Sequence, residues 1–194
     1  LTRQLAEIYS PAGARAFDAD IMKNVYGKFA VHVCEEGEIP APRRTEWKAG
    51  GNASGFRIGL DAGATNLKVC AVAEGKQVFS ESVPWKPRSH SDPQYHFEKI
   101  GGVIARAAEF LPRLDAVGVS TAGIPVGDRV MTSSLFTAIT DPEKRTRAQN
   151  LFLDLGKKFR VPVRVANDGD VAALAGCAGC EGGTLGISMG SSEA

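Results

Sequence analysis

The chain has 194 residues, of which 43% are hydrophobic, and its 23 basic and 22 acidic side chains leave a net charge of +1. This composition predicts a folded protein with one or two small cores, and the balanced charge favours neither a nucleic-acid partner nor a membrane partner. No apolar run approaches the roughly 18 residues of a membrane span, and the first residues lack a secretion signal. We therefore expect a cytoplasmic protein.

Residues 1–55 differ in composition from the rest of the chain. Segments 3–8 and 17–29 have a helical pattern, and 37–55 is rich in Pro, Arg and Gly. We predict an N-terminal helical extension and linker over 1–55 and a separate domain over 56–194. Because the chain starts without methionine and stops just after a strand-like run, we also expect it to be a fragment.

The turn after the first strand-like run of the second domain is suited to bind phosphate. It offers a glycine that lets a backbone approach a ligand, hydroxyl and amide donors, a carboxylate for a hydrated divalent cation, and an ammonium group. These are Gly63, Thr65 with Asn66, Asp61, and Lys68. Together they predict a site for a nucleoside triphosphate with Mg²⁺, in which Asp61 binds the metal through water. An ordinary Asp/Gly hairpin is the alternative interpretation.

The elements around this turn predict a mixed sheet. Runs 57–62, 67–73 and 77–83 have strand patterns and are joined by short turns, which predicts a three-stranded antiparallel meander. Trp85 follows in a proline-containing connection, where we expect it to pack that loop onto the domain. A helix over 95–111, a strand over 114–120, a small-residue turn over 121–125, a helix over 148–159 and a strand over 161–165 come next. This alternation predicts a parallel extension of the sheet to five strands.

A second group of polar residues follows the last of these strands. Asn167 and Asp168 lie directly before a helix-like run, and ligands of open α/β sheets gather at the carboxyl ends of strands. Helix capping is the alternative, since Asn and Asp are good N-caps. A third group, Gly190, Ser191 and Ser192, forms a turn that can present N–H and hydroxyl groups to an anion.

In this order the three groups resemble the motifs of the ROK family (repressors, open reading frames and kinases), within the actin-like ATPase superfamily. Ala64 replaces the second glycine of the family's first phosphate motif, and the segment 120–123 resembles its glycine loop near the sugar, without the proline. Asn167 and Asp168 match its Asn-Asp motif, whereas residues 189–192 depart further from its second phosphate loop. The first motif is matched by Gly59, Asp61, Gly63, Thr65 and Lys68.

The resemblance implies a ribonuclease H-like (actin-like ATPase) lobe over 56–194, with helices on both faces of a mixed five-stranded sheet and truncated before the second lobe. It implies an ATP-dependent carbohydrate kinase with Asp168 as general base, a small-molecule sugar as substrate, and a homodimer as one possible assembly. The chain alone would be inactive. Sugar binding is assigned to Asn167, Thr121 and Gly123, and ATP and Mg²⁺ binding to Asp61, Gly63, Thr65, Asn66, Lys68, Gly190, Ser191 and Ser192.

Two other functions remain open on the same motifs. A sugar-sensing regulator would bind sugar without phosphoryl transfer, which the altered turn at 190–192 and the unexplained residues 1–55 allow. A nucleotide-switched, chaperone-like ATPase would keep the phosphate turns but would not need an acid beside a sugar. Asp168 is therefore the residue that separates the three functions.

Overall fold

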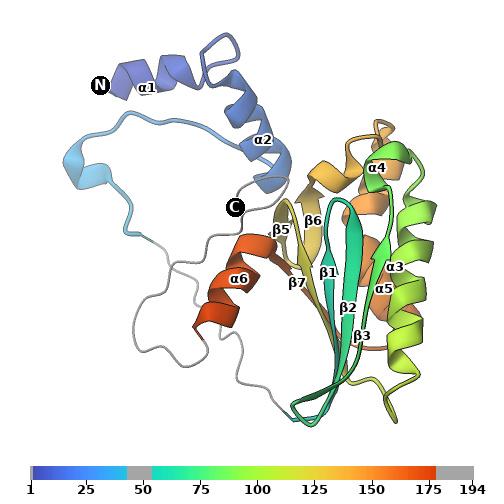
Figure 1. The fold of residues 1–194 in the computed structure, drawn as a ribbon. Coiled ribbons are helices and arrows are strands. Elements are labelled where there is room, and N and C mark those ends of the chain that lie inside the picture. The colour runs from blue at the N-terminus through green and yellow to red at the C-terminus, as the bar shows by residue number, and fades with distance from the viewer. Residues whose placement is uncertain (1, 43–53, 178–194) are drawn as a thin grey trace. The chain divides into compact units, whose positions relative to one another are not determined.

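The structure is a computed structural model that describes residues 2–42 and 54–177 (Figure 1). The chain divides into two compact units, Leu1–Ala49 and Gly50–Ala194. Each unit is described by itself below.

The N-terminal unit consists of two helices and an extended segment. Helices α1 (Thr2–Ile8) and α2 (Ala16–Tyr26) correspond to the predicted helical segments, and a 3-10 turn (Glu36–Glu38) follows. The rings of Tyr9 and Phe29 meet edge to face, with their centroids 5.5 Å apart. Among the described residues of this unit, Val25 is the one buried hydrophobic side chain. Burial of apolar surface therefore contributes little to the stability of this unit by itself.

The second unit is built on the predicted mixed sheet. Its strand order is β3-β2-β1-β4-β7, in which β1 pairs antiparallel with β2 and parallel with β4. Strand β2 pairs antiparallel with β3, and β4 pairs parallel with β7. The predicted five-stranded sheet, with its meander and its parallel extension, is confirmed. The strands are β1 (Phe56–Ala62), β2 (Asn66–Ala73), β3 (Lys76–Pro84), β4 (Ala116–Thr121) and β7 (Val163–Asn167).

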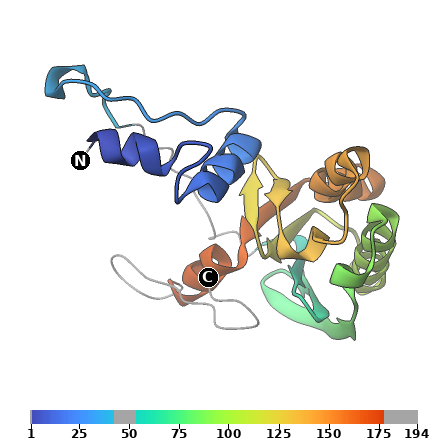
Figure 2. The ribbon, with the colours of Figure 1, turned by 90° about the horizontal axis from the view of Figure 1, so that it is seen from above.

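Helices cover both faces of this sheet, as predicted (Figures 1 and 2). Helices α3 (Pro93–Ala108) and α5 (Leu151–Phe159) pack on one face, and α6 (Asp168–Gly176) lies on the other. Alternate residues of the strands point toward α3 and α5, because successive side chains of a strand point to opposite faces. The core between the sheet and these two helices includes Ile58, Leu60, Val69, Val117, Val119, Ile100, Ile104, Phe152 and Leu155.

Two helices differ in their bounds from the prediction. Helix α3 begins earlier, at Pro93, because Asp92 Oδ1 accepts a 3.0 Å hydrogen bond from Gln94 N and proline suits the first helical position. The predicted helix 148–159 corresponds to α5, and a further helix that was not predicted, α4 (Pro142–Gln149), precedes it and ends at Asn150. Asn150 has φ −91° and ψ 1°, outside helical values, so it ends one helix and precedes the next. In the described part of the chain, no helix is long and apolar enough to cross a membrane.

The predicted small-residue turn at 121–125 is in fact the start of a β-hairpin. Strands β5 (Ile124–Val126) and β6 (Arg129–Thr132) are joined by Gly127 and Asp128, which have φ values of 58° and 65°. Asp128 Oδ1 accepts a 3.0 Å hydrogen bond from Val165 N of β7, and its Oδ2 lies 2.6 Å from Arg164 Nη1. The tip of the hairpin is thereby fastened to the edge strand of the sheet.

Candidate functional site

The sheet brings the first two predicted groups of site residues to one edge. Asp61 is paired with Ser120 across β1 and β4, and Thr121 is paired with Asn167 across β4 and β7. Adjacent strands lie about 4.8 Å apart. The phosphate turn after β1 and the Asn-Asp pair after β7 are therefore separated by the width of a single strand, β4. This edge is the carboxyl end of the parallel strands, where ligands of α/β sheets bind.

Asp61 is held by two neighbouring side chains. Its Oδ1 accepts a 3.1 Å hydrogen bond from Ser120 Oγ, and its Oδ2 lies 3.4 Å from Lys68 Nζ. The Lys68 side chain is 66% exposed, so its attraction to Asp61 is screened by water and weak. Lys68 can therefore turn toward an incoming phosphate while Ser120 keeps the carboxylate in place.

The turn between β1 and β2 places its polar groups at the surface. Gly63 N donates a 3.1 Å hydrogen bond to Asn66 O, which closes the turn, and Asn66 Nδ2 donates to Thr65 Oγ1 at 3.0 Å. A Cβ on Gly63 would lie 3.1 Å from Asn66 O, closer than ordinary packing allows. Thr65 is exposed. In this turn the backbones of Gly63 and Asn66 lie close together, and the hydroxyl donor of Thr65 is accessible.

Asn167 acts as the N-cap of α6, as the capping alternative supposed. Its Oδ1 accepts a 2.8 Å hydrogen bond from Gly169 N, and its Nδ2 donates to Gly123 O at 2.9 Å. The side chain thus ties the start of α6 to the loop that leads into β5. Among the described residues, its second amide hydrogen has no acceptor, so it can donate to a ligand.

Asp168 occupies the first position of α6 and is half-buried, whereas Asp170 is exposed. The N-terminus of a helix carries a partial positive charge, which stabilises a carboxylate there. Asp168 Oδ1 also accepts a 3.1 Å hydrogen bond from Gly169 N. Its side chain is consequently an ordered anion at the edge where the first phosphate turn also lies.

Gly123 has no room for a side chain. Its φ is +113°, and a Cβ would lie 2.1 Å from Thr132 O of β6. The close approach of this backbone to β6 directs the Gly123 carbonyl to Asn167 Nδ2. Gly123 therefore contributes its backbone to the site, and no larger residue can occupy the position.

Thr121 does not reach the site edge with its side chain. It is fully buried and its Oγ1 lies 3.5 Å from Ala122 O, so the hydroxyl is not open to a sugar. Its neighbour Ser120 points to the opposite face and contacts Asp61 instead. The strand pattern contained this signal, because Thr121 alternates in phase with the buried Val117 and Val119.

Gly190, Ser191 and Ser192 lie outside the described residues. In residues 2–42 and 54–177, no cluster of three or more His, Cys, Asp or Glu side chains could hold a metal ion. Mg²⁺ commonly binds one or two carboxylates together with water and substrate phosphates. Asp61 is a fitting ligand of that kind, with phosphate oxygens completing the coordination.

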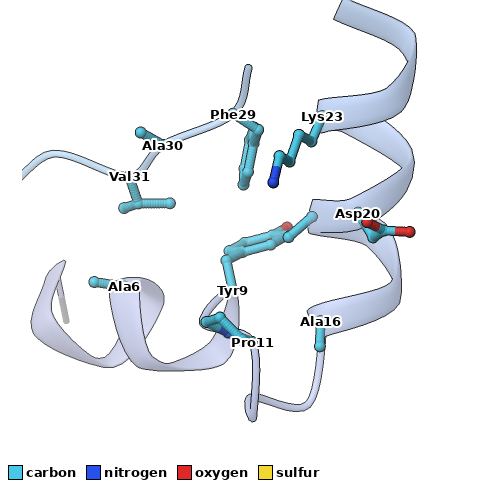
Figure 3. A pocket seen from close by; sticks show the side chains of 10 residues that line it. Ala6, Tyr9, Pro11, Ala16, Asp20, Lys23, Phe29, Ala30 and Val31 are labelled. Carbon is cyan, nitrogen blue, oxygen red and sulfur yellow. The ribbon is translucent and has the colours of Figure 1, made fainter. Parts of the chain in front are cut away.

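A cavity of about 590 Å³ lies in the N-terminal unit, and none of its lining residues is a predicted site residue (Figure 3). Lys23 extends toward the rings of Tyr9 and Phe29, whereas Asp20 points away from them. The lining combines small apolar residues with these rings and one ammonium group. The lining residues are Ala6, Tyr9, Pro11, Ala16, Ala19, Asp20, Lys23, Phe29, Ala30 and Val31.

A comparison with known protein families identifies the family of this chain. The model of the ROK family matches residues 57–181, and the chain therefore belongs to the ROK family. The predicted family is thus confirmed. A search of curated proteins gave no match.

Several solved structures are similar to part of this chain. They include the Lmo2764 protein of Listeria monocytogenes (21% identity, TM-score 0.48) and the ROK hexokinase of Thermus thermophilus (24%, TM-score 0.40). A third is a ROK family transcriptional regulator, a homolog of the Escherichia coli MLC protein (17%, TM-score 0.48). Each similarity covers 63% of this chain, and 38%, 37% and 30% of the respective structures. The chain thus spans less than half the length of these proteins.

Proposed function

We propose that this chain supplies the phosphate-binding and base-bearing lobe of a carbohydrate kinase, which transfers the γ-phosphoryl group of ATP to a sugar hydroxyl. One observation carries the proposal. The carboxylate of Asp61 and the Asn167–Asp168 pair follow parallel strands that are separated only by β4, at the same edge of the sheet. A metal-bound phosphate and a hydroxyl nucleophile need such neighbouring positions in phosphoryl transfer.

Each residue has a defined task in this reaction. Asp168 accepts the proton of the sugar hydroxyl, whose oxygen attacks the γ-phosphorus while the bond to the ADP oxygen breaks. Asp61 binds Mg²⁺ through water, and Lys68 offsets the negative charge of the phosphates. Thr65 and Asn66 hold the phosphates together with the turn at 190–192, and Gly63 lets the phosphates come close to the backbone. Asn167 and the backbone of Gly123 orient the sugar, whereas Thr121 is removed from this set by its burial.

The experiment is a coupled assay of ADP release on the chain in the full length that its gene encodes, with MgATP and a panel of sugars. Asp168→Asn should reduce kcat by about 10²- to 10⁴-fold, because the base is lost. Asp170→Asn is the matched control, since Asp170 lies in the same helical turn but is exposed. It should leave kcat within about threefold of the unaltered protein. Binding of MgADP should survive in both variants.

The alternatives give different results in the same assay. Turnover that persists in Asp168→Asn would contradict the role of Asp168 as base. A sugar that binds without stimulating ADP release would favour the sensing regulator, a class that the ROK family regulator among the similar structures represents. Nucleotide turnover that no sugar changes would favour a nucleotide-switched ATPase.

A further inference from the structure

Trp85 is bound to the phosphate turn at two points. Its indole Nε1 donates a 2.7 Å hydrogen bond to Gly63 O, and its backbone N donates a 3.0 Å hydrogen bond to Thr65 O. Trp85 follows directly after β3 and is 5% exposed. A single buried residue thus occupies two carbonyl oxygens of the three-residue turn 63–65.

These two hydrogen bonds decide which groups of the turn remain for a ligand. In the described part of the chain, the N–H groups of Ala64 and Thr65 donate to no protein acceptor. An anion is bound by backbone N–H groups that point toward it, while carbonyl oxygens near it would repel it. With the carbonyls of Gly63 and Thr65 bound to Trp85, two of the three carbonyl oxygens of the turn are occupied, while the N–H groups of Ala64 and Thr65 stay available to a ligand.

Trp85 itself is held by a buried aromatic cluster. The edge of its ring meets His96, with centroids 5.8 Å apart, and His96 in turn contacts Tyr95 and Phe136. His96 is fully buried, and its Nε2 lies 3.1 Å from Pro87 O. The segment that follows β3 is thereby fixed to the start of α3. A ring that is fixed in this way can orient the turn without itself moving when a ligand binds.

We propose that Trp85 is a positioning residue for the phosphoryl donor: its two hydrogen bonds orient the turn 63–65 so that the backbone N–H groups bind the phosphates of the nucleotide. The inference rests on the proposed function, because it assigns that turn to ATP. Loss of the indole N–H should therefore weaken binding of nucleotides through their phosphates, and leave the adenosine and sugar contacts unchanged.

The test compares Trp85→Phe with the unaltered full-length protein. Phenylalanine keeps an aromatic ring in the cluster and removes the donor to Gly63 O. One neutral hydrogen bond corresponds to about a three- to tenfold change in affinity. The Kd for MgADP and the KM for MgATP should rise by that factor, while KM for the sugar and Kd for adenosine should not change. Trp47→Phe, at the chain's other tryptophan, should change none of these values.

The outcomes separate a positioning role from a structural one. If Trp85→Phe raised the constants for MgADP, adenosine and sugar alike, Trp85 would only stabilise the fold and the inference would be wrong. An unchanged Kd for MgADP in a folded Trp85→Phe variant would also overturn it, with the proposed function intact. If the unaltered protein bound no nucleotide, the proposed function would fail together with the inference.

A second measurement follows the fluorescence of Trp85. Residues 1–194 contain two tryptophans, so the difference in fluorescence between Trp47→Phe and Trp47→Phe/Trp85→Phe isolates the emission of Trp85, whose indole N–H is bonded to Gly63 O. Saturating MgADP should change the intensity or the wavelength of this emission, and adenosine should not. An emission that MgADP leaves unchanged would contradict contact between the phosphates and the turn that Trp85 holds.

Discussion

Ser120 and Asp61 lie side by side on β4 and β1, and Ser120 Oγ donates a 3.1 Å hydrogen bond to Oδ1 of Asp61. The two strands are parallel and their pairing places both side chains on the same face of the sheet. The serine therefore fixes the rotation of the carboxylate and leaves the other oxygen, Oδ2, toward Lys68. A carboxylate with one oxygen held by Ser120 and the other beside the exposed Lys68 is oriented before a hydrated cation arrives.

Replacing Ser120 with alanine should weaken nucleotide binding that depends on the metal. The loss of one hydrogen bond predicts about a two- to tenfold increase in the Kd for MgADP, and a smaller change for ADP without Mg²⁺. Isothermal titration calorimetry measures both. Ser80→Ala, at an exposed serine of the edge strand β3, is the control. Equal affinity of Ser120→Ala and the unaltered protein for MgADP would show that Asp61 needs no such support.

Replacing Gly123 with alanine should destabilise the second unit. The new Cβ would lie 2.1 Å from Thr132 O and the residue would have to keep φ +113°, so we expect a loss of at least about 2 kcal/mol in the free energy of unfolding. Gly127→Ala is the control, since Gly127 also has a positive φ but has no atom within 4 Å of a new Cβ. It should cost about 1 kcal/mol. Urea unfolding measures both, and equal losses would contradict the steric explanation.

Asp128 holds the β5–β6 hairpin to β7, and we expect two substitutions of it to change the free energy of unfolding by different amounts. Asp128→Ala leaves the buried Val165 N–H without its acceptor, which should cost about 1–3 kcal/mol of unfolding free energy. Asp128→Asn keeps an acceptor oxygen and loses only the charge beside Arg164, whose side chain is 74% exposed. Its cost should be below about 1 kcal/mol. Thermal and urea unfolding measure the difference, and two equal costs would assign the effect to the ion pair instead.

His96 should make the stability of the fold depend on pH. Burial lowers the pKa of His96 below its ordinary value of 6.5, against the opposing effect of hydrogen bonds to the carbonyls of Asp92 and Pro87. The unfolded chain then binds more protons than the folded chain between the folded-state pKa and 6.5. Stability from this group is complete above pH 6.5 and decreases as the pH falls toward the folded-state pKa.

The slope of unfolding free energy against pH measures this effect. A single titrating group contributes at most about 1.4 kcal/mol per pH unit. His96→Phe should remove this contribution between pH 7 and the folded-state pKa, whatever its effect on stability at pH 8. His32→Gln, at an exposed histidine, should leave the slope as it is. A slope that His96→Phe does not alter would show that His96 does not titrate on unfolding.

The regular elements of the second unit could be predicted because their side chains repeat with the period of a strand or a helix. Segment 67–73 is a short apolar run with β-branched residues and became β2, and segment 77–83 has a period near two and became β3. Strands β5 and β6 have three and four residues, too few for a period to emerge. The pair Gly127–Asp128, between Val126 and Arg129, was the available signal, since glycine and aspartate favour hairpin turns.

The sequence predicted those features of the candidate site that depend on which residues lie at the ends of the parallel strands. Asp61 and Asn167 lie at one edge because they end parallel strands, which the strand order made predictable. Thr121 was predicted to bind sugar, but the alternation of side chains along β4 buries it. The contact between Trp85 and Gly63 depends on tertiary packing, and no local pattern in the sequence indicates it.

The pairing of β1, β4 and β7 also fixes the distance between the end of β1 and the end of β7. Backbone hydrogen bonds set the spacing of the strands, so the ends of β1 and β7 stay about 10 Å apart whichever side chains the strands carry. The connections between these strands can change in length at little cost, because closure entropy grows only slowly with loop length. Substitutions at the ends of the strands can therefore alter the chemistry of this lobe without altering the distance over which it acts.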